Sequence, residues 1–104
     1  MGQVVIVAYR PKPGKDDELL ALTREHHSIL AGQGLVTGRR PVIMRAKDGT
    51  VVEVFEWESG AIERAHGNPA VGELWKRYDA VCDYVPLASL AESTNLFADF
   101  EAVD

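Results

Sequence analysis

Histidines are the residues of this sequence best suited to proton transfer, and His26 is the first candidate. It lies at the centre of an apolar stripe with helical spacing that also holds Leu19, Leu22, Ile29 and Leu30. Imidazole exchanges protons near neutral pH, so a nitrogen of His26 that faced a pocket would bind or deprotonate an acidic phenol. The alternative is a core histidine whose ring nitrogens are hydrogen-bonded to backbone or to a tyrosine.

His66 is the second candidate, because it ends a short helical turn between Ala65 and Gly67. It would either overhang the mouth of a pocket or interact with the carbonyl groups at the helix C-terminus, and the second role is slightly favoured. His27 points to a different side of the helix from His26. The adjacent pair is therefore a poor metal chelate, and we expect His27 to be structural.

Four aromatic residues form the third group of candidates. Trp57 follows Phe55 at an alternate position of a strand, so the two side chains share a face. Trp75 and Tyr78 lie on one apolar stripe of a helix. Together with Tyr9, these rings would wall a pocket for a flat aromatic ligand. The alternative is that they fill the core.

The sequence does not support a metal site, a nucleotide-binding site or a catalytic pair of carboxylates. The histidines and Cys82 lack zinc-ligand spacing, and Cys82 lies on an apolar helical face that predicts a small buried side chain. Gly32-Gln33-Gly34 does not follow a strand, as a dinucleotide-binding loop would. Glu56, Glu58 and Glu63 are expected to be solvated. We therefore expect no metal and no cofactor.

The composition indicates one soluble globular domain spanning residues 1–104, with 46% hydrophobic and 26% charged residues. A net charge of −5 argues against nucleic acid or an anionic membrane as partner. A single cysteine allows no internal disulfide, and the first residues lack the features of a signal peptide or membrane helix. We expect a cytoplasmic protein.

Hydrophobic periodicity predicts the elements that must position these side chains. Strands are expected at 4–10, 40–46, 51–58 and 95–103, and helices at 15–33, 59–66 and 69–84. Asp48-Gly49 predicts a hairpin turn, Ser59 is expected to cap the short helix, and residues 87–93 are either a short helix or a loop. This order is typical of an α+β, ferredoxin-like fold, the split βαβ arrangement with two helices on one face of a four-stranded antiparallel sheet.

The predicted strands carry apolar side chains on both faces. Residues 4–9 are apolar throughout, and Val52 and Val54 lie opposite Val51 and Phe55 in the third strand. Helices cover only one face of such a sheet. A second copy of the chain is therefore expected to cover the other face, which predicts a homodimer.

The strand that ends at Trp57-Glu58-Ser59, followed by a short helix that ends at Ala65-His66, resembles the antibiotic-biosynthesis-monooxygenase-like family of the dimeric α/β barrel superfamily. The predicted element order and the length cover essentially the whole chain. The resemblance implies that the sheets of two subunits close into a homodimeric α/β barrel, with a pocket between each sheet and its helices. Some members oxygenate anthrone- or quinol-like aromatic compounds without metal or flavin, and others degrade haem.

The sequence departs from the haem-degrading members at two positions. Trp75 stands near the place of their iron-ligating histidine, and Tyr9 stands near the place of an asparagine on their first strand. A second histidine that other members carry after the Ala-His pair is absent from residues 68–71. Haem degradation is therefore disfavoured.

Three functions are compatible with these features. The resemblance favours a cofactor-independent monooxygenase of a small aromatic hydroxy or quinol-type compound, with His26 or His66 as the catalytic base. The expected substrate-binding walls are the four aromatic residues, Tyr9, Trp57, Trp75 and Tyr78. The alternatives are a non-catalytic binding protein for a small apolar molecule and a structural protein whose pocket is filled by its own side chains.

Overall fold

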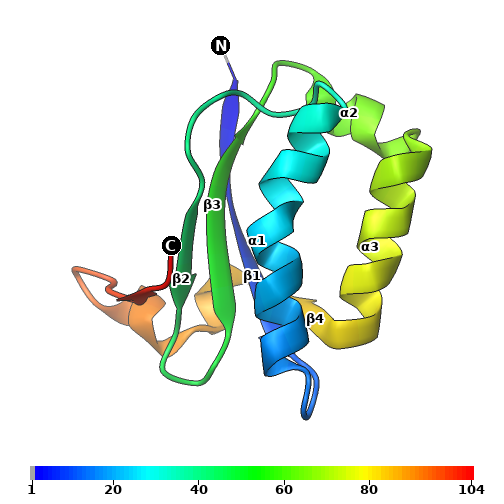
Figure 1. Cartoon of the computed structure of the whole chain (residues 1–104). Helices are drawn as coiled ribbons and strands as arrows, with labels where there is room; N and C mark the ends of the chain where they lie inside the picture. The colour runs from blue at the N-terminus through cyan, green and yellow to red at the C-terminus, as the bar shows by residue number, and fades with distance from the viewer. Residues whose placement is uncertain (1) are drawn as a thin grey trace.

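Two layers make up the structure, an antiparallel sheet and a pair of long helices that lie side by side on one of its faces (Figure 1). The computed structural model describes residues 2–104. The strands are β1 (Gln3–Pro11), β2 (Val42–Arg45), β3 (Val51–Trp57), β4 (Cys82–Val85) and β5 (Glu101–Ala102). The helices are α1 (Asp16–Gly32), α2 (Ala61–His66) and α3 (Pro69–Val81), with two short 3-10 helices, η1 (Leu87–Ser89) and η2 (Ala91–Thr94).

The strands lie in the order β4-β1-β3-β2-β5, and every neighbouring pair is antiparallel. The first four strands of this order, with α1 and α3 as the connecting helices, give the βαββαβ sequence of a ferredoxin-like fold. The predicted α+β class and antiparallel sheet are therefore confirmed. β5 adds a short fifth strand at the β2 edge.

The identity of the fourth strand was predicted wrongly. α3 ends at Val81 rather than near Tyr84, and the next residues pair with β1 as β4, with Cys82 opposite Pro11 and Val85 opposite Ala8. The backbone of Cys82 is already extended, at φ −152° and ψ 170°. The free edge of β1 needs hydrogen-bond partners, and pairing with it overrides the helical spacing of the apolar residues.

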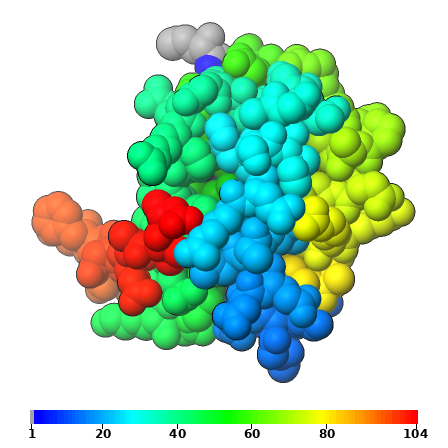
Figure 2. All heavy atoms as spheres, in the orientation of Figure 1, coloured from blue at the N-terminus to red at the C-terminus, as the bar shows by residue number. Residues whose placement is uncertain are grey.

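The predicted strand over residues 95–103 is also wrong, except for β5. Most of this stretch is irregular, and Phe97 is 83% exposed. Figure 2 shows part of the C-terminal segment, coloured orange, standing out from the body of the molecule. The ambiguous residues 87–93 form η1 and most of η2.

The outer face of the sheet, away from α1 and α3, is covered over part of its area by the chain itself. Leu90 forms a small buried cluster there with Ala8 and Val52, and Leu87 and Phe100 pack against it. Elsewhere the face is open, and its exposed apolar residues are Val4, Ile6 and Val42. The segment after β4 thus covers one part of the face that a second copy was expected to cover, and the homodimer stays a prediction.

The start of α2 differs from the prediction, and the start of α3 is capped by an asparagine. Gly60, in the left-handed conformation at φ 71°, precedes α2, and no side chain caps that helix, so Ser59 does not have the predicted role. At α3 the Oδ1 atom of Asn68 accepts hydrogen bonds from the backbone N–H groups of Ala70 (2.9 Å) and Val71 (3.2 Å). Asn68 is therefore the cap of the helix that carries Trp75 and Tyr78.

We expect Asn68→Ala to lower the free energy of unfolding by about 1 kcal/mol, because it leaves the N–H groups of Ala70 and Val71 without their acceptor. Urea denaturation followed by circular dichroism measures this change. Asn95→Ala is the matched control, since Asn95 is exposed and the described chain shows no hydrogen bond to its side chain. Equal stability of Asn68→Ala and the control would contradict the capping role.

Candidate functional site

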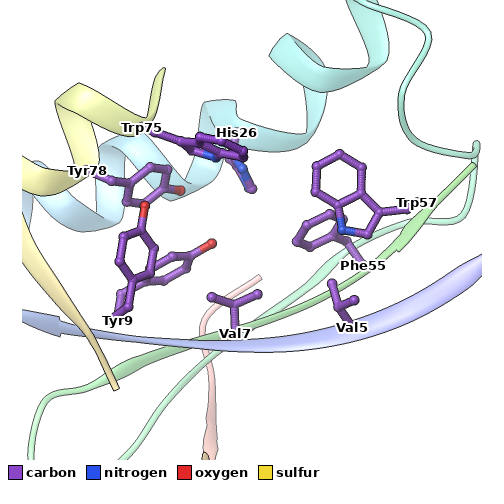
Figure 3. A pocket seen from close by; sticks show the side chains of 9 residues that line it. Val5, Val7, Tyr9, His26, Phe55, Trp57, Trp75 and Tyr78 are labelled. Atoms are coloured by element: carbon purple, nitrogen blue, oxygen red, sulfur yellow. The ribbon is translucent and has the colours of Figure 1, made fainter. Parts of the chain in front are cut away.

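A pocket of about 160 Å³ lies between the sheet and the two long helices (Figure 3). Strands β1 and β3 form one wall, helices α1 and α3 form the opposite wall, and β4 contributes one side chain. The lining residues are aliphatic or aromatic apart from one imidazole: Val5, Val7, Tyr9, His26, Phe55, Trp57, Trp75, Tyr78 and Tyr84. The pocket therefore offers an apolar, ring-lined space with one histidine.

The register of β1 and β3 places a carboxylate behind this pocket. Val7 pairs with Glu53 and Tyr9 pairs with Val51, so these side chains emerge on the face that α1 covers. Glu53 is 0% exposed. A charge buried so completely must be paired and hydrogen-bonded to be tolerated.

Two side chains satisfy the Glu53 carboxylate. The Tyr9 hydroxyl donates to Oε1 at 2.7 Å. The Nδ1 atom of His26 lies 2.8 Å from Oε1 and 3.0 Å from Oε2. Residues from β1, β3 and α1 thus meet in one buried cluster, which we call the Tyr9–Glu53–His26 cluster.

The protons in this cluster follow from the chemistry of its members. An ionised carboxylate accepts hydrogen bonds and donates none, so Nδ1 of His26 carries the proton that it shares with Glu53. Burial and the nearby charge of Glu53 raise the pKa of Tyr9 well above its ordinary value of 10.0. Tyr9 therefore stays protonated and remains a donor. In neutral His26 the other ring nitrogen, Nε2, then carries a lone pair.

Nε2 of His26 opens onto the pocket. His26 is 4% exposed and lines the pocket, and no hydrogen bond to Nε2 occurs within residues 2–104. Thr50 Oγ1 is the one fully enclosed side-chain polar atom without a partner in that part of the chain, so Nε2 is in contact with open space. The edge contacts of the imidazole with the rings of Phe55 (5.2 Å) and Tyr78 (5.3 Å) fix its orientation.

Tyr78 closes the α3 side of the pocket. Its ring stacks on that of Tyr9 with centroids 4.6 Å apart, and its hydroxyl donates to Oγ1 of Thr23 at 3.2 Å. Thr23 in turn donates to the carbonyl of Leu19 at 2.9 Å. Burial, and next the charge of Glu53, raise the pKa of Tyr78, so this hydroxyl also stays protonated.

The structure brings five of the six predicted site residues together. Tyr9, His26, Trp57, Trp75 and Tyr78 all line the pocket. The sixth does not line it: His66 lies exposed at the end of α2, and its ring packs edge-on against that of Trp75 with centroids 5.3 Å apart. His27 has the expected structural role, since its Nε2 lies 3.2 Å from the carbonyl oxygen of Thr37.

Glu53 is the functional candidate that the sequence analysis missed. It occupies an inward position of β3, in phase with Val51, Phe55 and Trp57. The signal in the sequence was a charged residue at a strand position that shares its face with apolar residues. A carboxylate is buried at such a position only when another group pairs with it. Glu56, by contrast, lies on the outer face and accepts from Arg39 at 2.8 Å.

Other reactive groups do not join this site. Cys82 is buried in β4 rather than on a helix, and burial, with the charges of Asp83 and Asp79, raises its pKa to about 11. Among the described residues, no group of three metal-ligating side chains converges. The helices within residues 2–104 include none with the length and apolar character needed to cross a bilayer.

Comparison with known proteins adds no relative. No family model, no curated protein and no solved structure matches this chain. The pocket and the Tyr9–Glu53–His26 cluster behind it are therefore the features of the molecule that bear on its function.

The raised pKa of Tyr9 predicts a specific loss of stability in alkaline solution. The folded state holds the Tyr9 proton more tightly than the unfolded state, so this stabilising contribution is complete below pH 10 and is lost as the pH rises towards the higher folded pKa. Between pH 10 and 11 the free energy of unfolding should therefore fall more steeply in the wild type than in Tyr9→Phe. The difference in slope should approach about 1.4 kcal/mol per pH unit.

Denaturant titrations at a series of pH values measure both slopes. Tyr84→Phe provides a comparison at a tyrosine that makes no hydrogen bond to Glu53; burial raises the pKa of Tyr84 as well, so this change should also make the fall in stability less steep. Parallel curves for the wild type and Tyr9→Phe would contradict the assignment of Tyr9 as a permanently protonated donor.

Proposed function

We propose that the protein binds a small aromatic hydroxy compound in this pocket and oxygenates it without a cofactor, with His26 as the base. The observation that carries the proposal is the fixed imidazole, whose Nδ1 is held by buried Glu53 while Nε2 opens onto an aromatic pocket. A histidine oriented by a carboxylate is the arrangement that enzymes use to take a proton from a hydroxyl group.

His26 would first remove the hydroxyl proton of the bound phenol. The Tyr9–Glu53–His26 cluster supports this step, since the Glu53 carboxylate stabilises the imidazolium that forms. The phenolate has a higher electron density in its ring than the phenol has. It is therefore the form that transfers an electron to molecular oxygen.

The oxygenation then balances without another reductant. One electron passes from the phenolate to oxygen, and the resulting radical pair combines at a ring carbon to form a hydroperoxide, with the proton supplied by the imidazolium. Cleavage of the O–O bond with loss of the hydrogen on that carbon leaves a carbonyl group and releases water. A quinol and oxygen thus give a hydroxyquinone and water, and both electrons needed to form water come from the substrate.

Oxygen uptake with a panel of monocyclic, bicyclic and tricyclic phenols and quinols tests the proposal. His26→Asn should lower the initial rate at least about 100-fold, because it removes the base. His66→Asn is the matched control and should leave the rate unchanged, since His66 does not line the pocket. An unchanged rate in folded His26→Asn would overturn the assignment.

A binding function without turnover is the second candidate. The observation that favours it is the hydrocarbon and aromatic character of nearly the whole lining, which suffices to hold an apolar ring. Ligand binding by a protein that consumes no oxygen with any member of the panel would establish this function instead.

We also propose that two copies of the chain pair through the open part of the outer sheet face. Ile6 pairs with Val54, and Val54 pairs with Val42, so apolar side chains form a continuous row across β1, β3 and β2. Ile6 and Val42 are roughly half exposed. A contiguous apolar patch on a sheet is typical of an interface between identical subunits.

Ile6→Glu should convert a dimer into a monomer, because it places a charge in the centre of the patch without a partner. Sedimentation equilibrium at micromolar concentration measures the mass, which is 11.4 kDa for one chain. Ala21→Glu adds the same charge on the exposed side of α1 and should leave the dimer intact. A wild-type protein that sediments at the mass of one chain would overturn the pairing.

A further inference from the structure

The indole N–H of Trp57 is a second polar group that opens onto the pocket. Trp57 is 8% exposed, and no acceptor for its Nε1 lies within reach in residues 2–104. Nε1 is not among the fully enclosed unpaired atoms, so it contacts open space, as Nε2 of His26 does. Figure 3 shows the indole nitrogen on the side of the ring that faces Phe55 and Val5.

A buried indole N–H without an acceptor is destabilising unless water or a ligand supplies one. The other buried polar groups of this region follow that rule, since Tyr9, Tyr78 and Thr23 all have partners. Nε1 of Trp57 and Nε2 of His26, which belong to buried residues and line the cavity, have no such partner within residues 2–104. A ligand that satisfied both would carry an acidic hydroxyl group for His26 and an oxygen acceptor for Trp57.

The volume of the cavity sets the expected size of the ligand. The Phe55 ring contacts both the imidazole of His26, with centroids 5.2 Å apart, and the indole of Trp57, with centroids 5.3 Å apart, so the two groups flank the same ring. A single benzene ring that carried one oxygen towards His26 and another towards Trp57 would satisfy both groups. The cavity volume of about 160 Å³ agrees, because an engineered cavity of about 150 Å³ is known to bind benzene.

We infer that Trp57 is a specificity-determining residue and that the pocket selects single-ring phenols with an oxygen acceptor opposite the hydroxyl group. The inference rests on the proposed function in one respect, since it places the phenol hydroxyl at His26. It goes further by assigning Trp57 as the second residue that holds the ligand and by excluding fused-ring compounds from the pocket.

Two phenols of equal size isolate the Trp57 hydrogen bond. 4-Methoxyphenol and 4-ethylphenol differ in the atom opposite the hydroxyl group, which is an acceptor oxygen in the first and a methylene in the second. Calorimetric titration under nitrogen measures binding without turnover. The wild type should bind 4-methoxyphenol at least about fivefold more tightly. In Trp57→Phe, which removes the N–H and retains an aromatic ring, the ratio should fall to about one.

Fused-ring phenols test the size limit in the wild type alone, which keeps the inference testable if Trp57→Phe does not fold. 2-Naphthol and anthrone should bind at least about tenfold more weakly than 4-methoxyphenol, because a second ring exceeds the cavity. Equal or tighter binding of either compound would overturn the single-ring limit. A ratio of the two single-ring phenols near one in the wild type, or an unchanged ratio in Trp57→Phe, would overturn the role of Trp57.

These outcomes are separate from failure of the proposed oxygenation. If the binding ratio depends on Trp57 and no oxygen is consumed, the inference holds and the proposed reaction fails. If oxygen uptake depends on His26 and the binding ratio does not depend on Trp57, the reaction holds and the inference fails.

Discussion

The buried carboxylate of Glu53 links the two layers of this protein through hydrogen bonds. Glu53 projects from the central strand β3 towards the helices, where water cannot reach it, and its charge is tolerable because Tyr9 and His26 both bind it. Those partners belong to β1 and α1, so the pairing of the strands and the position of the helix must both be correct for the cluster to form. Removal of one partner from such a cluster costs several kcal/mol, because it leaves the others buried and unpaired.

The pocket follows from the same constraint. Glu53 fixes one nitrogen of His26, and the rings of Phe55 and Tyr78 fix the plane of the imidazole, so the free nitrogen has a defined direction. Trp57 contributes a donor at the far side of Phe55. The polar groups of the pocket are thus few and rigidly held, while the remaining walls are hydrocarbon and aromatic. This combination supports the proposal that the pocket takes a small aromatic ligand, which it would recognise by shape and by the positions of its oxygens.

Sequence periodicity was sufficient to predict the α+β class, the two long helices and the grouping of Tyr9, His26, Trp57, Trp75 and Tyr78. Each of these depends on the local period of the apolar residues, which directs side chains to one face. The fourth strand was not predictable in this way, because its residues continue the apolar spacing of α3 and become a strand through pairing with β1. Glu53 was overlooked because its role depends on partners 44 and 27 residues distant.

The junction between α3 and β4 has no loop: the helix ends at Val81 and the strand begins at Cys82. Tyr78 and Tyr84, which both line the pocket, stand on either side of this junction. A ligand that displaced α3 outwards would therefore strain the hydrogen bonds between β4 and β1, since no flexible loop separates α3 from β4. If the pocket binds the proposed ligand, a molecule too large for it would have to distort this sheet edge as well as the helix.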